Sequence, residues 1–301
     1  MLLFSTNTNS ELAKALARHA HLKLGLLEIK TFSDGELYIR PKEKIRGQVV
    51  LVIGSTMPPS DNLAKLLILL NALKTNGAKK INLIIPYFGY ARQDWIDQPN
   101  APLSAKLMPD LLAAAGADKI FTFNLHSGQN EKFFTVPLVH LSAYPALVDH
   151  FKKMRLKNLM IFSPDQGGIH RAEQFAKIYG KKDLAGPVGY CKKYRPKPNV
   201  AVVTLPKKFN VRGKNIILVD DMIDTAGTLV GAANSLHRAG AKNIYACAAH
   251  GILSGPAIAR IKKSPIKEVI VTDTYPLPPK KKIKKIKIIS VALILFNGIK
   301  N

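Results

Sequence analysis

The chain has 301 residues, of which 47% are hydrophobic, and its formal net charge is +25. This length suits two domains of ordinary size, each able to bury a core. No apolar run reaches the roughly 18 residues of a membrane span and no signal peptide is visible, so we expect a soluble protein that is not exported.

The two cysteines, Cys191 and Cys247, lie far apart and without metal-ligand spacing. They fit a reducing compartment, so we expect a soluble, cytoplasmic protein without a structural disulfide. The positive charge is compatible with nucleic-acid binding, but the lysines are scattered and no aromatic residues alternate with them as on a base-stacking surface. We therefore predict neither a nucleic-acid nor a membrane partner and attribute the charge to solvated faces and to anionic substrates.

Apolar runs and helical patterns alternate along the chain. Strands are predicted at 49–53, 81–86, 120–124, 159–163, 216–219, 244–248 and 268–272, and helices at 62–76, 104–115, 144–153, 169–178 and 229–239. This alternation predicts an α/β fold with mainly parallel sheets flanked by helices. The lysine-rich run at 280–287 is interpreted as a solvated connector to a final strand at 286–295, with a polyanion-binding tag as the weaker alternative.

A Gly-Ala connector occurs three times, at 76–81, 116–120 and 239–244. Each copy has the pattern of a Gly-capped helix end that leads into a strand. The first and last copies follow a strand, a loop and a helix of similar length, which indicates two halves of like topology. We predict domains at 1–143 and 144–301, with the option that the last strand returns to the first domain.

The segment 32–36 is expected to form a turn that carries Phe32, Asp34 and Glu36. The carboxylates can accept hydrogen bonds from the exocyclic amine of a purine, and the phenyl ring offers a stacking surface. The alternative is an ordinary Asp-Gly hairpin turn.

The segment 86–94 follows a predicted strand and contains Arg92, Gln93 and Asp94. Arginine at the carboxyl end of a strand is suited to bidentate contact with a phosphate, and its two neighbours can add polar contacts. A surface Arg-Asp pair is an equally good interpretation of these residue types alone.

Two further strand ends carry His126 and Asp165. Together they can hold one Mg²⁺ ion, completed by nucleotide phosphates and water, although a lone histidine is more often structural.

The basic segment 192–197 contains Lys193 and Arg195, which lie on one side of an extended chain. We expect a mobile segment that closes over a transferring phosphoryl group, with a solvated basic loop as the alternative.

The most informative segment is 219–228, where an apolar strand ends in two carboxylates and leads through a small-residue loop into a helix. Its polar and loop residues are Asp220, Asp221, Asp224, Thr225, Ala226, Gly227 and Thr228. The loop N–H groups, the hydroxyls and the helix N-terminus can hold a phosphate. The carboxylates upstream then face the hydroxyls of a phosphorylated sugar, or a metal ion.

Taken together and in this order, these motifs resemble the ribose-phosphate pyrophosphokinase family. The resemblance runs from residue 4 to about residue 274 and rests most specifically on Tyr90–Asp94, Ala101–Lys106, Ser163–Asp165, Lys193–Arg195, 219–228 and the His-Gly-Ile-Leu-Ser-Gly-Pro-Ala sequence at 250–257. It implies two phosphoribosyltransferase-type domains and transfer of the diphosphoryl group of MgATP to the C1 hydroxyl of ribose 5-phosphate, which releases AMP. A non-catalytic regulatory homologue and a base phosphoribosyltransferase are the alternatives.

The resemblance also implies roles for the residues named above. ATP binds Phe32, Asp34, Glu36, Arg92, Gln93 and Asp94; Mg²⁺ binds His126 and Asp165; ribose 5-phosphate binds 224–228 with Asp220 and Asp221 on its hydroxyls; and Lys193, Arg195 and His126 act in catalysis. Family members form dimers or hexamers, so a homo-oligomer is expected.

Several positions depart from the family pattern. Asn124 stands where Asp is usual, Val139 replaces another usual Asp, Asn100 replaces a residue that is often basic, and the chain ends at Asn301, before the usual C-terminal end. Because the last three regions help to form the regulatory anion site of the family, we expect ADP to inhibit only by competing with ATP.

Overall fold

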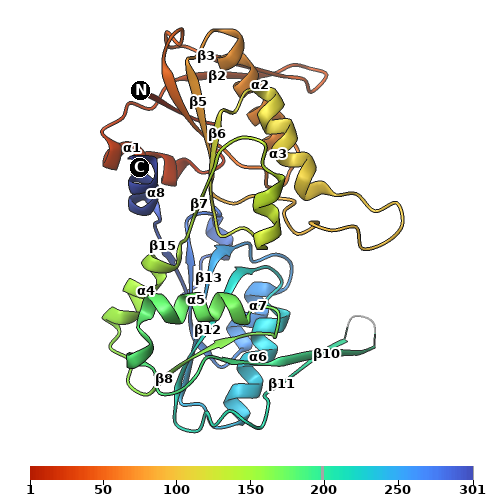
Figure 1. Cartoon of the computed structure of the whole chain (residues 1–301), viewed down its shortest axis with the longest axis vertical. Helices are drawn as coiled ribbons and strands as arrows, with labels where there is room; N and C mark the ends of the chain where they lie inside the picture. Colours follow the sequence, from red (N-terminus) through yellow and green to blue (C-terminus); the bar gives the residue numbers. More distant parts are fainter. Residues whose placement is uncertain (198–199, 301) are drawn as a thin grey trace. The chain divides into compact units, whose positions relative to one another are not determined.

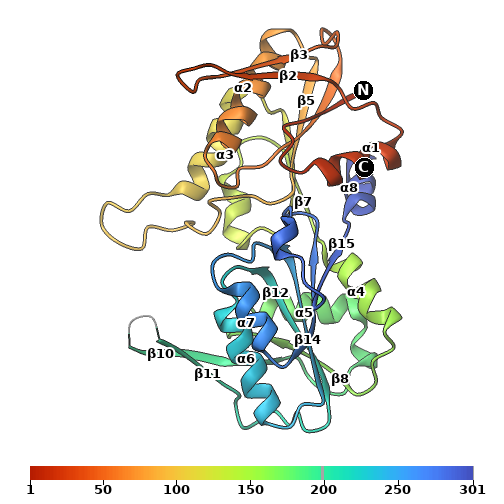
Figure 2. The same cartoon turned by 180° about the vertical axis from the view of Figure 1, so that it is seen from behind.

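Two compact units make up the computed structural model, which describes residues 1–197 and 200–300, with the side chains of 195–197, 200 and 201 outside that description. One unit comprises Met1–Ser142 with Val291–Asn301, and the other comprises Ala143–Ser290. Each unit contains a parallel sheet flanked by helices, as Figures 1 and 2 show. The predicted α/β class is confirmed. Among the described helices, none combines the length and the apolar character that crossing a membrane requires.

The first unit is built on a five-stranded sheet in the order β1-β4-β5-β6-β7, in which every pair is parallel. Its strands are β1 (Leu2–Ser5), β4 (Val49–Ile53), β5 (Lys80–Ile85), β6 (Lys119–Phe123) and β7 (Leu138–Leu141). The central strands are buried on both faces, which explains why they read as continuous apolar runs.

Helices cover this sheet. They are α1 (Ser10–Ala20), α2 (Asp61–Thr75), α3 (Ser104–Ala115) and α8 (Ala292–Lys300), with a short 3₁₀ helix, η1 (Gly128–Phe133). Helix α8 lies beside α1, where the rings of His19 and Phe296 stack at 6.5 Å, and Gly298 packs on Leu141. The predicted strand at 286–295 is therefore wrong in its second half. From residue 291 the buried positions are Val291, Ala292 and Leu295, a spacing that fits one helix face.

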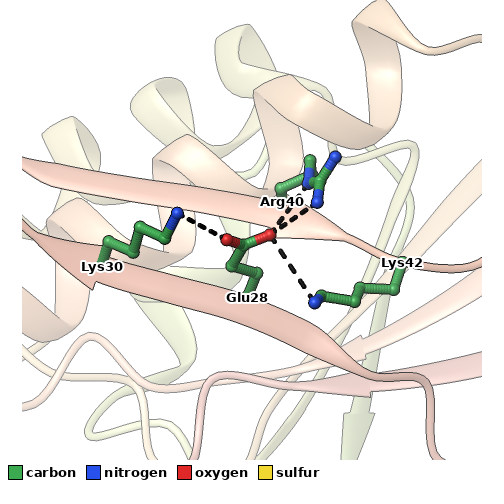
Figure 3. A network of polar contacts seen from close by, with 4 residues as sticks. All are labelled: Glu28, Lys30, Arg40 and Lys42. Carbon is green, nitrogen blue, oxygen red and sulfur yellow. Dashed lines mark hydrogen bonds and ion pairs between the residues drawn. The ribbon is translucent and has the colours of Figure 1, made fainter.

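A separate two-stranded sheet in the first unit joins β2 (Leu27–Thr31) to β3 (Leu37–Pro41). On this hairpin Glu28 stands opposite Arg40 and accepts two of its hydrogen bonds, at 3.0 and 2.7 Å. Lys30 lies 2.7 Å and Lys42 3.8 Å from the same carboxylate, as Figure 3 shows. Hydrogen bonds from Lys30 and Arg40 lower the pKa of Glu28 to about 2.

We predict that Glu28 stays ionised where an ordinary glutamate is protonated. Because its pKa in the folded state is lowered, the stabilising contribution of the cluster is complete above the ordinary value and is lost as the pH falls toward about 2. Carboxyl NMR titration should give a midpoint near 2 for Glu28. A midpoint for Glu28 near the ordinary value of a glutamate would contradict the prediction.

The second unit is built on a six-stranded parallel sheet in the order β15-β14-β13-β12-β8-β9. Its strands are β8 (Leu159–Ser163), β9 (Gly189–Tyr190), β12 (Asn215–Ile223), β13 (Asn243–Gly251), β14 (Ile266–Thr272) and β15 (Ile286–Ile289). Its helices are α4 (Tyr144–Lys153), α5 (Ile169–Tyr179), α6 (Gly227–Arg238) and α7 (Ala257–Lys263), with η2 (Lys181–Asp183) and η3 (Pro279–Lys281).

Strand β12 has an apolar core on each face. Ile216 and Leu218 belong to the cluster that contains residues of α6, and Ile217 and Val219 belong to the cluster that contains residues of α4 and α5. Successive side chains of a strand point to opposite faces, so a strand buried on both sides requires an unbroken apolar run.

The basic segment, predicted to be extended and mobile, forms strand β10 (Lys192–Lys197), paired antiparallel with β11 (Val200–Thr204). This ribbon extends from the body of the second unit in Figure 1. Its base is fixed to α6, because Val203 is buried in the α6 cluster and Ser235 Oγ donates a hydrogen bond of 2.5 Å to Val203 O.

Two lysines of the 280–287 run have structural contacts, which corrects its interpretation as a purely solvated connector. Lys285 Nζ donates to the carbonyls of Ile261, Lys262 and Ser264 at 2.8 to 3.3 Å, where α7 ends. Lys281 Nζ donates to Ile252 O at 2.8 Å. Free carbonyls at a helix end are favourable partners for a cation, so part of this charge serves the fold.

Candidate active site

The adjacent carboxylates of the second unit, Asp220 and Asp221, lie near the carboxyl end of strand β12. This strand is longer than predicted because its pairing with β13 continues to Ile223 and Gly251. The Asp221 side chain is buried, whereas that of Asp220 is 26% exposed. Arg171 of α5 lies 3.6 Å from Asp220 and 3.5 Å from Asp221. Burial, and then repulsion by Asp221, raise the pKa of Asp220 well above its usual value, and Arg171 opposes this shift.

The small-residue loop, residues 224–228, joins β12 to α6 and includes Gly227 and Thr228, the first two residues of α6. Its central residue, Ala226, has a φ of 59°, in the left-handed region that residues with a side chain rarely adopt. Helix α6 begins directly afterwards at Gly227, so the N–H groups of its first turn have no partner within the helix and face outward. Such an arrangement can bind a phosphate group.

Lys193 connects the basic ribbon with this loop. Its Nζ donates a hydrogen bond of 2.9 Å to Thr228 Oγ1. Two motifs that stand 35 positions apart in the sequence therefore meet at one point of the second unit. The Arg195 side chain, the other predicted member of the basic pair, lies outside the described residues.

Asp165 lies on the turn between β8 and α5, where its Oδ1 accepts a hydrogen bond of 3.1 Å from Gly168 N. Strand β8 is the direct parallel neighbour of β12, so this turn and the acid pair follow adjoining strands at the same edge of the sheet. Burial, and then the Asp165 charge, raise the pKa of the Cys191 thiol to about 12, so this cysteine stays neutral.

In the first unit, the loops after β5 and β6 are joined by hydrogen bonds. Ser127 Oγ donates to Asp94 Oδ2 at 2.5 Å, and Gln129 Nε2 donates to Asp94 O at 3.1 Å. Gln93 Nε2 reaches Asp97 Oδ1 at 3.4 Å. The structure thus brings the segments that contain Arg92 and His126 together at the carboxyl edge of the first sheet.

Phe32, Asp34 and Glu36 occupy the tip of the β2–β3 hairpin, and all three are exposed. Phe32 N donates to Glu36 O at 2.8 Å, and Asp34 Oδ1 accepts a hydrogen bond of 3.0 Å from Glu36 N. The turn is therefore an ordered hairpin turn, the alternative interpretation of this segment, and it leaves the phenyl ring available to a ligand.

Similarity to known proteins extends over 99% of the chain. Residues 1–116 match the model of the N-terminal domain of ribose phosphate pyrophosphokinase, and residues 187–301 match that of the phosphoribosyl synthetase-associated domain. The ribose-phosphate pyrophosphokinase of Caldanaerobacter subterraneus subsp. tengcongensis is 48% identical over 299 residues, 99% of this chain and 93% of that protein. The chain belongs to the ribose-phosphate pyrophosphokinase family.

Other family members agree. The ribose-phosphate pyrophosphokinase of Bacillus caldolyticus is 45% identical over 298 residues, 99% of this chain and 93% of that protein. The crystal structure of phosphoribosylpyrophosphate synthetase from Mycobacterium smegmatis superimposes with a TM-score of 0.89 at 35% identity, covering 99% of this chain and 97% of that one. The predicted family, its diphosphotransferase class and the phosphoribosyltransferase-type architecture are confirmed. A catalytic pyrophosphokinase is favoured over a non-catalytic regulatory homologue and over a base phosphoribosyltransferase.

The predicted metal ligands, His126 and Asp165, are compatible with a magnesium ion that is bound partly by the phosphates of a substrate. The described residues contain no group of three or more His, Cys, Asp or Glu side chains placed to hold an ion. Magnesium is commonly bound by only one or two carboxylates together with substrate phosphates. His126 belongs to the first unit and Asp165 to the second. The latter offers a carboxylate that the turn holds in place.

The sequence did not indicate three contributors to this pyrophosphokinase site. In the sequence, Arg171 resembles an ordinary surface residue of an amphipathic helix. Its position shortly after Gly167 and Gly168, near the predicted strand end, is the feature that could have indicated a site residue. Ser254 and Arg260 contact the 224–228 loop; Ser254 lies in the 250–257 sequence that carries the family resemblance, and Arg260 lies beyond it.

Proposed function

We propose that the chain transfers the diphosphoryl group of MgATP to the C1 hydroxyl of ribose 5-phosphate, giving phosphoribosyl pyrophosphate and AMP. The observation that carries the proposal is the hydrogen bond from Lys193 to Thr228, because it joins the predicted phosphoryl-stabilising cation to the predicted sugar-phosphate loop. Family membership supports the same reaction.

We assign the sugar-phosphate side to residues 144–301, and its proposed binding residues all belong to the second unit, Ala143–Ser290. The loop from Asp224 through Thr225, Ala226 and Gly227 to Thr228 holds the 5-phosphate with N–H groups and hydroxyls. Asp220 and Asp221 accept hydrogen bonds from the ribose hydroxyls and thereby orient C1. Fixing the nucleophile in this way is the main means by which phosphoryl transfer is accelerated.

We assign the nucleotide side to residues 1–143. Phe32 stacks on the adenine ring, while Asp34 and Glu36 accept hydrogen bonds from its exocyclic amine. Arg92 contacts the phosphates, and Gln93 and Asp94 line the same loop. The ordered hairpin tip and the Asp94–Ser127 hydrogen bond support these roles, because both hold the segments in a fixed geometry.

We assign Mg²⁺ as the cofactor, with His126 and Asp165 as its protein ligands; when bound, it neutralises nucleotide phosphate charge. His126 thereby also takes part in catalysis. In the reaction, a bond forms between the C1 oxygen and the β-phosphorus, and the bond from the β-phosphorus to the bridging oxygen of AMP breaks. Lys193 and Arg195 stabilise the charge that develops on the transferred group.

The proposal is tested by supplying the purified chain with MgATP and ribose 5-phosphate and, separately, with phosphoribosyl pyrophosphate and purine bases. We expect the first mixture to yield phosphoribosyl pyrophosphate and the second to yield no nucleotide. Nucleotide formation in the second mixture would favour a base phosphoribosyltransferase. No turnover without an added active homologue would favour a regulatory protein.

Asp224→Ala and Thr228→Ala are predicted to weaken ribose 5-phosphate binding by about tenfold or more each, because hydrogen bonds that hold a charged ligand are among the stronger ones. Calorimetry with each ligand alone checks this, and the affinity for ATP should stay within about twofold. A loss of ATP affinity with unchanged sugar-phosphate affinity would reverse the assignment of the two units.

We further propose a cytoplasmic homo-oligomer, a dimer or a hexamer, in which ADP competes with ATP and has no second site. Asn100 and Val139 support the last point, since both lack the charge usual at these positions of the family. Initial rates should show that saturating ATP relieves inhibition by ADP. Inhibition that excess ATP leaves unchanged would reveal a second site.

A further inference from the structure

The segment 252–260 of the second unit, between β13 and the middle of α7, has no role in the function proposed above. It nevertheless contacts the loop that is proposed to bind the sugar phosphate. Its hydrogen bonds run from Leu253 N to Ile223 O (2.9 Å), from Ser254 N to Asp224 O (3.1 Å), from Ser254 Oγ to Asp224 Oδ1, and from Arg260 Nη1 to Thr225 O (2.9 Å).

Backbone conformation shows that the two segments are held closely. Leu253 is fully buried with a φ of 51°, and Ala226 is buried with a φ of 59°. A residue with a side chain keeps such a conformation only where its surroundings determine it strongly. The hydrogen bonds between the segments contribute to that determination, because they fix Leu253 and Ser254 on one side and the residues directly before Ala226, from Ile223 to Thr225, on the other.

Ser254 is placed to orient the Asp224 carboxylate. Its hydroxyl donates to one carboxylate oxygen and its backbone N–H donates to the carbonyl of the same residue. Both the side chain and the backbone of Asp224 are thus fixed by one partner. A hydroxyl bonded to an ionised carboxylate is a comparatively strong contact, and its loss lets the carboxylate turn.

The segment is itself anchored on its other side. Lys281 Nζ donates to Ile252 O at 2.8 Å, directly before Leu253. Burial, and then the neighbouring Lys280, lower the pKa of Lys281, which fits a lysine drawn partly into the protein by this contact. Ser254 therefore acts from a fixed support.

We propose that Ser254 is a positioning residue for the sugar phosphate: it holds Asp224, and with it the 224–228 loop, in the geometry that receives the 5-phosphate of ribose 5-phosphate. Arg260 assists by fixing the Thr225 carbonyl, and its guanidinium lies beside Gly227, where an added Cβ would stand 3.3 Å from Nη1. This inference rests on the proposed function, because it assigns the ligand of the loop.

The test is Ser254→Ala. We expect the KM for ribose 5-phosphate to rise about tenfold, the range expected for losing one hydrogen bond to a charged group, while the KM for ATP changes less than about twofold. Ser254→Thr keeps the hydroxyl and should restore most of the affinity. Arg260→Gln should raise the same KM to a smaller extent.

Ser264→Ala is the matched control. Ser264 lies directly after α7, where its hydroxyl donates to Ile261 O at 2.8 Å and accepts from Ile266 N at 3.3 Å, so the variant loses buried hydrogen bonds that do not involve the loop. Both KM values should stay near those of the unchanged protein. An equal rise of the two KM values in Ser254→Ala, or a rise in the control, would mean a general structural role and overturn the inference.

Amide hydrogen exchange provides a readout that does not depend on turnover. In Ser254→Ala, the N–H groups of residues 225–228 should exchange at least about tenfold faster, while those of β12 keep their protection. If the unchanged protein makes no phosphoribosyl pyrophosphate but exchange responds in this way, the proposed function fails and the positioning role stands. Unchanged exchange together with an unchanged KM for ribose 5-phosphate would exclude the positioning role of Ser254.

Discussion

Replacing Lys193 with alanine is expected to lower kcat by about 10²–10³-fold while changing both KM values by less than about threefold, since removing one preorganised charge-stabilising donor has effects of this size. Lys193 Nζ donates a hydrogen bond to Thr228 Oγ1, at the end of the loop that we propose to hold the sugar phosphate, and we assign its charge to the group being transferred. Its charge is needed most where negative charge develops, which is in the transition state rather than in the bound substrates.

Lys192→Ala is the control for this variant. Lys192 precedes Lys193 on β10 and is exposed, and neighbouring residues of a strand point to opposite faces. Steady-state kinetics with both substrates should therefore show near-normal turnover for Lys192→Ala. If Lys193→Ala also keeps near-normal turnover, the ribbon is only a solvated basic element and the catalytic assignment fails.

Arg171→Ala is expected to have the second largest effect, because Arg171 is the cation beside two adjacent carboxylates, one of them buried. Removing one partner of a buried ion pair costs about 3–5 kcal/mol. The separations of 3.5 and 3.6 Å and the 22% exposure of the arginine side chain reduce our expectation to about 1–3 kcal/mol of unfolding free energy.

The effect of this variant should depend on pH in a defined direction. The pKa of Asp220 is already raised in the folded protein, and Arg171 lowers it, so the variant raises it further. A carboxyl whose pKa is raised on folding loses stability as the pH increases through that range. The difference in unfolding free energy should therefore be small in acid and grow toward neutral pH, and the acid limb of the pH–rate profile should move to higher pH.

Denaturant titrations at several pH values check the stability change, with Lys177→Ala on the same helix as the control. Lys177 is exposed and forms no ion pair with the described residues, so its removal should leave stability and the pH profile unaltered. A pH-independent loss in Arg171→Ala would show that the arginine acts through packing and not through the acid pair.

The elements with strong local signals were predicted from the sequence. The three Gly-Ala connectors are helix ends with positive φ at Gly77, Gly116 and Gly240, each followed by a strand. Buried parallel strands such as β4 and β8 begin and end where their apolar runs do. These features depend on backbone conformation and burial over a few residues, which the sequence encodes directly.

The contacts that build the site depend on tertiary pairing, and the sequence did not indicate them. The Lys193–Thr228 contact requires the β10–β11 ribbon, whose formation depends on Val203 packing against α6. The place of Arg171 beside the acid pair follows from α5 packing against β12. The sequence predicts strand where helix α8 forms, because a short apolar run fits the period of either element.

The most direct test of the central claim is to follow the ATP-dependent reaction of the unchanged protein with ribose 5-phosphate by ³¹P NMR and nucleotide chromatography. We predict that AMP forms in equal amount to a sugar product carrying a diphosphate at C1, because the C1 oxygen attacks the β-phosphorus. Stoichiometric ADP with a monophosphate at C1 would show attack at the γ-phosphorus. That result would make the protein a simple sugar-phosphate kinase and contradict the account.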